Sequence, residues 1–229
     1  MYTALTIASV CLMAVCLPCY VVAIKPGYSW KTLILKMVCS TAFLLIALFS
    51  ALKTGTLNGI FAQFMIFGFA CSWVGDVMLH LDPGMVRIAI GVVFFLAAHV
   101  FFIYAYVKNL GGAFISAKEI IAICVIWAIV IAAALIMKLK LNIYALAVVI
   151  YGTVLMFMLI KAFELGMSFA PASYIPAVLL TGGALLFTIS DATLAAGFFG
   201  KKSYKGSVIN ITTYFIGQTL LALSVLVVK

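Results

Sequence analysis

The chain has 229 residues and a formal net charge of +9; 68% of its residues are hydrophobic and only 8% are charged. Soluble domains carry about 25% charged residues, so this composition excludes a soluble globular protein and a second, water-exposed domain. It predicts a single integral membrane domain, residues 1–229, surrounded by membrane lipids.

Continuous apolar runs of about 20 residues, the length that crosses a bilayer, follow one another along the chain. They predict eight transmembrane helices, at residues 3–24, 31–52, 58–80, 86–107, 118–137, 141–163, 174–198 and 206–228. The runs do not alternate between apolar and polar residues, which excludes a β-barrel. The predicted fold class is therefore all-α, a polytopic bundle of eight transmembrane helices.

The Lys and Arg residues lie mainly in the short connections between these runs, where they set orientation. Connections after odd-numbered helices hold eight of them; the other connections and the C-terminus hold five. The positive-inside rule therefore predicts that both termini lie outside, in a multi-pass protein that we expect in a bacterial inner membrane. No basic cluster with interleaved aromatic residues is present, so the charge does not indicate nucleic-acid binding.

Two aspartates interrupt apolar runs: Asp76 in the third predicted helix and Asp191 in the seventh. An ionisable residue in a membrane span is costly and marks a candidate functional site. Asp76 lies about one turn, and Asp191 about two turns, from the same end of two parallel helices, and Lys36 lies about five residues into the second helix. At ~1.5 Å per residue, all three reach a similar depth, which predicts one shared site.

Other polar residues recur at helical spacing on the same helices. Ser72 shares a face with Asp76, and His99 lies on the fourth helix. The eighth helix carries one further stripe at intervals of four: Asn210, Tyr214 and Gln218. Ser190 is expected to hydrogen-bond the neighbouring Asp191, and the stripes together predict a polar cavity.

Structural alternatives exist for each of these residues. Asp76 and Lys36 can form a buried ion pair that fixes packing, His99 can be a packing histidine, and Asn210 and Gln218 can join helices by hydrogen bonds. Glu119 and Glu164 are expected to be interfacial and solvated.

Two carboxylates in a low-dielectric pocket can divide the work of an acid and a base. One stays protonated and donates a proton, while the other stays ionised and orients water or stabilises a cation, as in glycosidases. Only two histidines are present, and the six cysteines lie in apolar runs with a lone Cys16-x-x-Cys19 pair. These residues do not form a zinc-ligand set, so no metal and no cofactor are predicted.

Four segments carry a resemblance to a known family: WVGDVML at 73–79, FFLAAH at 94–99, FTISDATLA at 187–195 and YFIGQTL at 214–220. In this order, and over nearly the whole chain, they resemble the YhhN family of membrane proteins. That family includes animal lysoplasmalogenases, which hydrolyse the vinyl ether bond of lysoplasmalogen to a fatty aldehyde and glycerophosphocholine or glycerophosphoethanolamine. Family members often have Lys-Pro near the start of the second helix, whereas here Met37 follows Lys36.

The resemblance implies a lysophospholipid substrate and a catalytic pair of Asp76 and Asp191, one delivering a proton and the other activating water. Lys36 is then expected to meet the phosphate or to tune Asp76. The remaining expected substrate-binding residues are Ser72, His99, Ser190, Asn210, Tyr214 and Gln218. The alternatives are a proton-coupled transporter, in which the aspartates relay protons, and a non-catalytic lipid-binding protein.

Overall fold

The computed structural model describes residues 1–25, 27, 29–81, 84–136, 145–199 and 203–228. This part of the chain contains eight α-helices and no strand, which confirms the predicted fold class. The helices are α1 (Tyr2–Ala23), α2 (Trp30–Thr54), α3 (Ile60–His80), α4 (Met85–Leu110), α5 (Ala117–Ile136), α6 (Ala145–Ser168), α7 (Ile175–Phe199) and α8 (Tyr204–Ser224).

Local signals explain the helix ends that the hydropathy pattern placed only approximately. The Ser29 side chain caps α2 in a reciprocal capping box with Thr32, which satisfies backbone N–H groups at the helix start. Gly55 (φ +70°) and Gly111 (φ +66°) end α2 and α4 in the left-handed conformation that favours glycine. α4 thus continues beyond the predicted residue 107, whereas α8 ends before the predicted residue 228. The boundaries predicted at 137 and 141 fall outside the described residues.

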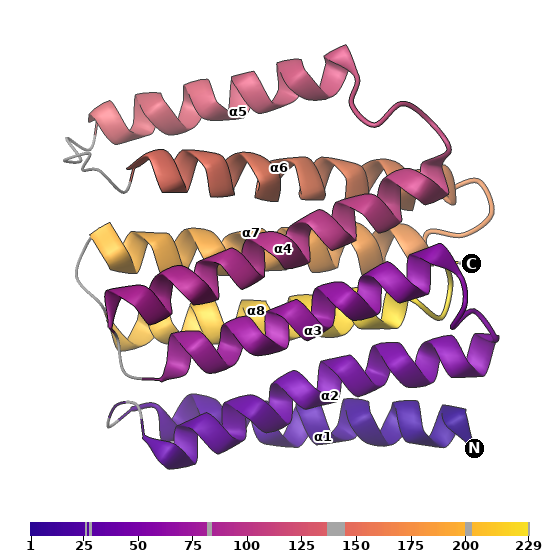
Figure 1. Ribbon diagram of the computed structural model, residues 1–229, viewed down its shortest axis with the longest axis horizontal. Helices are drawn as coiled ribbons and strands as arrows, with labels where there is room; N and C mark the ends of the chain where they lie inside the picture. Colours follow the sequence, from indigo (N-terminus) through magenta and orange to yellow (C-terminus); the bar gives the residue numbers. More distant parts are fainter. Residues whose placement is uncertain (26, 28, 82–83, 137–144, 200–202, 229) are drawn as a thin grey trace.

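Successive helices run up and down, and all of them except the pair α4 and α5 lie side by side (Figure 1). The most extensive contacts join α3 to α4, α7 to α8 and α1 to α2, while α5 lies at the edge of the bundle against α6. Both chain termini lie at one end of the bundle (Figure 1). We call this the terminal end and the opposite one, where α2 begins and α3 and α7 end, the distal end.

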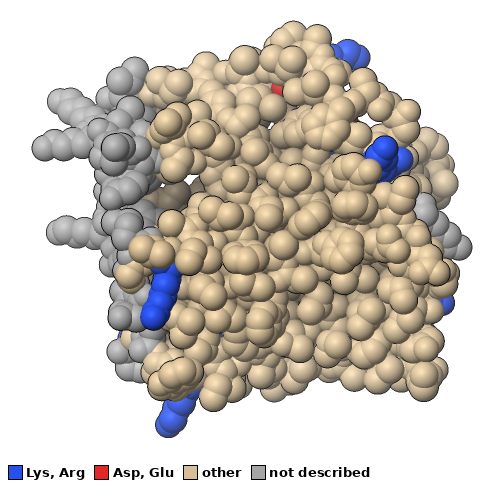
Figure 2. Space-filling model, in the orientation of Figure 1, with Lys and Arg blue, Asp and Glu red and all other residues tan. Residues whose placement is uncertain are grey.

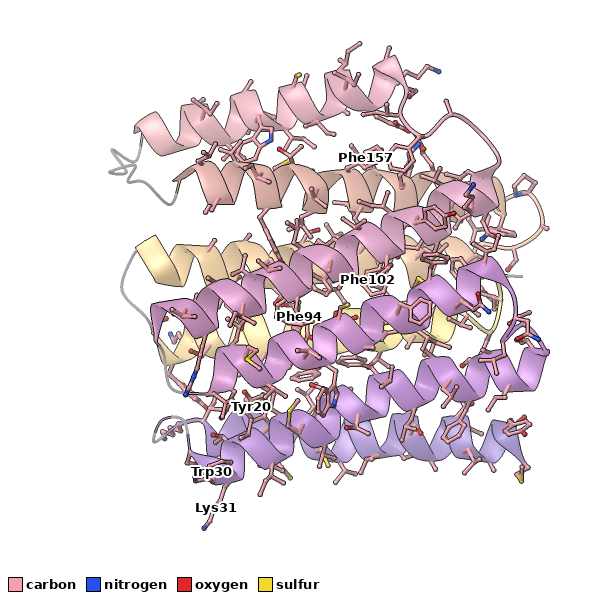
Figure 3. All side chains as sticks on the ribbon, in the orientation of Figure 1. Tyr20, Trp30, Lys31, Phe94, Phe102 and Phe157 are labelled. Atoms are coloured by element: carbon pink, nitrogen blue, oxygen red, sulfur yellow. The ribbon has the colours of Figure 1, made fainter. Side chains whose placement is uncertain are left out.

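The surface fits a membrane environment. Seven helices in the described part of the chain are long and apolar enough to cross a bilayer, so the chain is a multi-pass membrane protein. The face in Figure 2 is almost entirely uncharged, and its Lys and Arg side chains lie toward the two ends of the helices. Trp30 and Lys31 project outward from the start of α2 (Figure 3), where aromatic and basic residues commonly meet the membrane interface.

Polar contacts attach the edge helix α5 to α6. Glu119, expected to be solvated, is instead buried and pairs with Lys161, a buried residue well inside α6. Glu164, on the same face of α6 as Lys161, is partly exposed and lies 3.1 Å from its ammonium group. Further along, the Trp127 indole donates a hydrogen bond of 2.9 Å to the Thr153 hydroxyl. The expectation for Glu119 was wrong because the cation that pairs with it lies 42 positions away on the neighbouring helix.

Glycines bring α7 and α8 into backbone contact. A Cβ atom added at Gly217 would lie 2.8 Å from the carbonyl oxygen of Gly183 and 3.0 Å from the backbone nitrogen of Phe187. Small residues allow such close approach between transmembrane helices. Because backbone cannot rotate out of the way as a side chain can, a methyl group there would push the helices apart.

We therefore expect Gly217→Ala to destabilise the protein by about 1–3 kcal/mol, the usual cost of overpacking. The change is measured as a lower midpoint of thermal unfolding in detergent. Gly182→Ala is the matched control, since its added Cβ would meet its nearest neighbour, the Leu220 side chain, at an ordinary 3.7 Å. Equal melting temperatures for the two variants would contradict this account of the α7–α8 contact.

Candidate functional site

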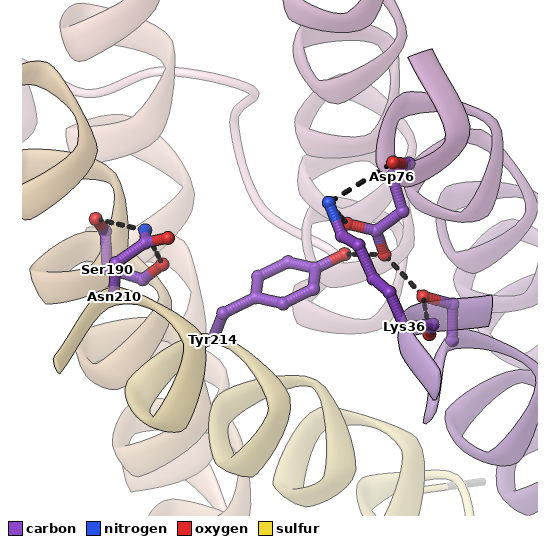
Figure 4. Close-up of polar contacts among 6 residues, drawn as sticks. Lys36, Asp76, Ser190, Asn210 and Tyr214 are labelled. Carbon is purple, nitrogen blue, oxygen red and sulfur yellow. Dashed lines mark hydrogen bonds and ion pairs between the residues drawn. The ribbon is translucent and has the colours of Figure 1, made fainter. Parts of the chain in front are cut away.

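Asp76 of α3 is almost completely buried and fully engaged by donors from two other helices. The Lys36 ammonium of α2 lies 3.0 Å from its Oδ1 atom. The hydroxyls of Ser40 (2.6 Å) and Tyr214 (2.7 Å) both donate hydrogen bonds to Oδ2 (Figure 4). The carboxylate therefore joins α2, α3 and α8 at one point.

Lys36 is bound at that same point. Besides the ion pair, its ammonium donates a 3.1 Å hydrogen bond to the backbone carbonyl of Asp76. This confirms the common depth predicted for the two residues. It also realises the ion pair that sequence reasoning had treated as an alternative to a functional role, although here the pair lines a pocket.

Asp191 of α7 has a different environment. The Tyr151 hydroxyl of α6 donates a hydrogen bond of 2.5 Å to its Oδ2 atom, and Nε2 of His99 lies 3.7 Å from the same oxygen. The His99 ring packs between Tyr151 (5.2 Å between centroids) and Phe187 (4.9 Å). No lysine or arginine among the described residues forms an ion pair with this carboxylate, which distinguishes it from Asp76.

One pocket, lined by residues of α1, α2, α3, α4, α7 and α8, includes both aspartates. Its cavity volume is about 70 Å³, and both Asp76 and Asp191 line it. That volume holds a few water-sized molecules, since one water needs about 10–15 Å³. The other predicted site residues that line it are Lys36, Ser190, Asn210 and Tyr214. The structure thus supports the prediction that widely separated segments meet at one polar site.

Two predicted contacts differ in detail. Ser190 was expected to partner Asp191, but its hydroxyl (2.8 Å) and its backbone carbonyl (2.9 Å) both accept hydrogen bonds from the Asn210 amide (Figure 4). This pair joins α7 to α8, as the alternative for Asn210 had proposed. The serine hydroxyl turns toward α8 because an amide donor lies within reach there.

Three predicted substrate-binding residues do not line the pocket. Ser72, His99 and Gln218 are fully buried and absent from its walls. The helical stripes placed them on the interior faces correctly, but periodicity specifies a face and not an open cavity. They lie inside the bundle, one step removed from the pocket.

Several site residues were missed by sequence reasoning. Tyr151 and Ser40 each donate directly to an aspartate, and Tyr20 and His80 line the pocket. The position of Ser40, four residues after Lys36 on α2, was a usable signal. Tyr151 gave none, because among the described residues of α6 it alone has a polar contact with this site, and it does not form part of a stripe.

Aromatic packing fixes the position of Tyr214 between the two carboxylates. Its ring lies 5.4 Å from that of Phe187 and 5.9 Å from that of Phe95, with steep angles between the planes in both cases. Such edge-to-face contacts hold an aromatic ring in a defined orientation. The hydroxyl of Tyr214 is therefore aimed at Asp76, which suits a preorganised site.

No group of three or more His, Cys, Asp or Glu residues in the described ranges is arranged to hold a metal ion. Within those ranges, the polar chemistry of the pocket comes from carboxylate, ammonium, hydroxyl and amide groups and from the imidazole of His80.

Comparison with known proteins gives one match. The family model described as the YhhN family matches residues 30–225 of the chain, a range that includes both aspartates and every residue that contacts them. Neither the curated proteins nor the solved structures include a match to the chain.

The Lys36–Asp76 pair makes a testable prediction about stability. Lys36→Met leaves a buried carboxylate without its cation, and breaking a buried pair in this way costs about 3–5 kcal/mol. We expect a large drop in the thermal midpoint for Lys36→Met and a partial recovery in the double variant Lys36→Met/Asp76→Asn, whose side chains are both uncharged. The pairing would be contradicted if the double variant lost as much stability as Lys36→Met and Asp76→Asn, measured separately, lose together.

Proposed function

Because the chain belongs to the YhhN family, we propose that it is an intramembrane hydrolase of lysoplasmalogens. It cleaves the vinyl ether bond to give a fatty aldehyde and glycerophosphocholine or glycerophosphoethanolamine, by general acid/base catalysis with Asp76 and Asp191. The observation that carries the proposal is the small pocket lined by both carboxylates.

The chemistry needs an acid, a water molecule and a group that stabilises positive charge. Protonation of the β-carbon of the vinyl ether gives an oxocarbenium ion. Water adds to its cationic carbon and loses a proton, and the resulting hemiacetal releases the glycerol oxygen as an alcohol and leaves the aldehyde. The proton consumed in the first step is returned, so the net reaction consumes one water.

The different environments of the two carboxylates support a division of roles. Asp76 is paired with the Lys36 ammonium and accepts two hydroxyl hydrogen bonds, an arrangement that suits a carboxylate that stabilises a cation and accepts a proton from water. Among the residues that the structure describes, Tyr151 and the imidazole of His99 are the polar groups beside the Oδ2 atom of Asp191. Asp191 is the better candidate to carry the proton to carbon, and Lys36 acts through Asp76.

The walls of the pocket suit an amphipathic substrate. Ser190, Asn210 and Tyr214 supply polar groups, and Leu79, Leu194 and Ile211 supply apolar ones. The small cavity accommodates the vinyl ether and its neighbouring atoms, and the long alkenyl chain lies among apolar side chains. In the proposed binding mode, the reactive bond lies beside the two carboxylates.

The pocket lies toward the distal end of the bundle. If both termini face outside, as the distribution of Lys and Arg predicts, this end faces the cytoplasm of a bacterial inner membrane. Both termini lie at one end of the bundle, so they face the same side of the membrane, and the assignment of that side rests on the distribution of Lys and Arg alone.

The test is aldehyde release from a lysoplasmalogen by the purified protein. We expect Asp76→Asn and Asp191→Asn each to lower kcat by about 10²–10⁴-fold, the usual contribution of a positioned acid or base. Glu164→Gln, which removes a carboxylate on α6 that is not part of the pocket, is expected to keep the wild-type rate.

The matched substrate control is the 1-O-alkyl lysolipid, which has no double bond to protonate and is expected to release no aldehyde. Wild-type protein that is folded and releases none from the alkenyl lipid either would refute the proposal. Proton-gradient-dependent uptake into vesicles would then identify the transporter alternative.

The isotopic composition of the product tests the mechanism separately. Protonation of the β-carbon predicts that the reaction in D₂O places one deuterium on the carbon next to the aldehyde carbonyl. Mass spectrometry after immediate reduction to the alcohol measures it. An aldehyde without deuterium would exclude protonation at carbon, even if the enzyme releases aldehyde.

A further inference from the structure

Among the interior side chains whose hydrogen-bonding groups no described residue satisfies with ordinary geometry, three lie one helical turn from residues of the pocket or its aromatic wall. They are the hydroxyl of Ser72 on α3, both ring nitrogens of His99 on α4 and both amide atoms of Gln218 on α8. All three residues have no exposed surface. Buried polar groups in native proteins are nearly always paired with protein or with ordered water.

The helix register places these three residues in one layer. Tyr214 contacts Asp76 by a hydrogen bond and Phe95 by ring packing. Ser72 precedes Asp76 by four residues, while His99 and Gln218 follow Phe95 and Tyr214 by four. Because α3 runs opposite to α4 and α8 (Figure 1), each of these steps leads one turn, about 6 Å, toward the terminal end.

The close contacts between α3 and α4 confirm this register. A Cβ atom added at Gly75 would touch the Phe95 ring, and one added at Gly68 would touch the Phe102 ring. Ser72 and His99 lie between these two contacts on their respective helices. One turn further toward the terminal end, the rings of Phe69 and Phe102 pack 5.2 Å apart and bound the layer with apolar surface.

We propose that Ser72, His99 and Gln218 form a binding site for water, one helical turn deeper than the two aspartates. The three side chains offer hydroxyl, imidazole and amide groups, which together provide the two to four polar partners that a buried water needs. Apolar side chains of the same size at these positions would offer no hydrogen bonds, and the layer would then not bind water.

His99 connects this site to the pocket. Its Nε2 atom lies 3.7 Å from Asp191, and its other ring nitrogen is available to the water layer. The connection has a consequence that rests on the proposed function. When a lysolipid fills the pocket, the layer still holds water next to His99, the neighbour of Asp191.

Solid-state NMR on protein with ¹⁵N-labelled histidine, in lipid bilayers, tests the site directly. The chain has only two histidines, and His80 lines the pocket, so its ring is the internal reference for contact with water. His80→Gln assigns the two signals. We expect magnetisation to pass from water to the His99 ring about as quickly as to His80, and transfer to His80 alone would overturn the proposal.

Variants of the other two residues test whether the layer itself holds the water. Ser72→Ala/Gln218→Leu is expected to slow transfer to His99 several-fold and to leave transfer to His80 unchanged, which also reports that the pocket is intact. Ser50→Ala is the matched control, since it removes another buried hydroxyl without a partner. Ser50 lies near the C-terminal end of α2, whereas the pocket residue Lys36 lies near the N-terminal end. Unchanged transfer to His99 in the double variant, or in Ser72→Ala where the double variant does not fold, would overturn the proposal.

The NMR measurement needs no turnover. If the wild type releases no aldehyde but its His99 ring contacts water, the proposed function fails and the water site stands. If aldehyde is released but no magnetisation passes from water to the His99 ring, the proposed water site is wrong and the proposed hydrolase function is retained.

Discussion

A carboxylate in the hydrocarbon interior of a membrane must be surrounded by donors, because an unpaired charge there is very costly. Asp76 meets this requirement with an ammonium group and a hydroxyl from α2 and a second hydroxyl from α8. The same contacts hold three helices in register and aim the groups that line the pocket. The contacts that solvate the carboxylate therefore also set the geometry of the site. For this reason a stable ion pair here does not argue against a functional role.

Asp191 is solvated differently, and the contrast gives the site its asymmetry. Its neighbours are a tyrosine from α6 and a buried imidazole from α4, neither of which carries a fixed charge. Two carboxylates in one pocket with such different partners are suited to different roles, which is the division that the proposed acid–base mechanism uses. The aromatic rings of Phe187 and Tyr214 lie against each other and connect the two assemblies in a rigid arrangement.

Sequence reasoning recovered those parts of the molecule that depend on local pattern. Hydropathy located the helices, and the rise per residue placed Lys36, Asp76 and Asp191 at one depth, because both rules act along a single helix. It could not find Tyr151 or the partner of Glu119, since these contacts depend on which helices are neighbours. Ser72, His99 and Gln218 lie inside the bundle, as the stripes predicted, but they do not line the pocket, because a polar stripe specifies a helix face and does not reveal where packing closes.

The close packing of side chains around the pocket bears on how the proposed hydrolase obtains water inside the membrane. The pocket, the polar layer behind it and the apolar rings of Phe69 and Phe102 follow one another along the bundle axis. A lipid substrate competes with water for a pocket of this size, whereas a layer of amide, hydroxyl and imidazole groups behind it favours water over any acyl chain. If water is held there, the apolar rings beyond it separate this water from the terminal end. The proposed hydrolase would then have a supply of water beside its pocket without an open channel through the membrane.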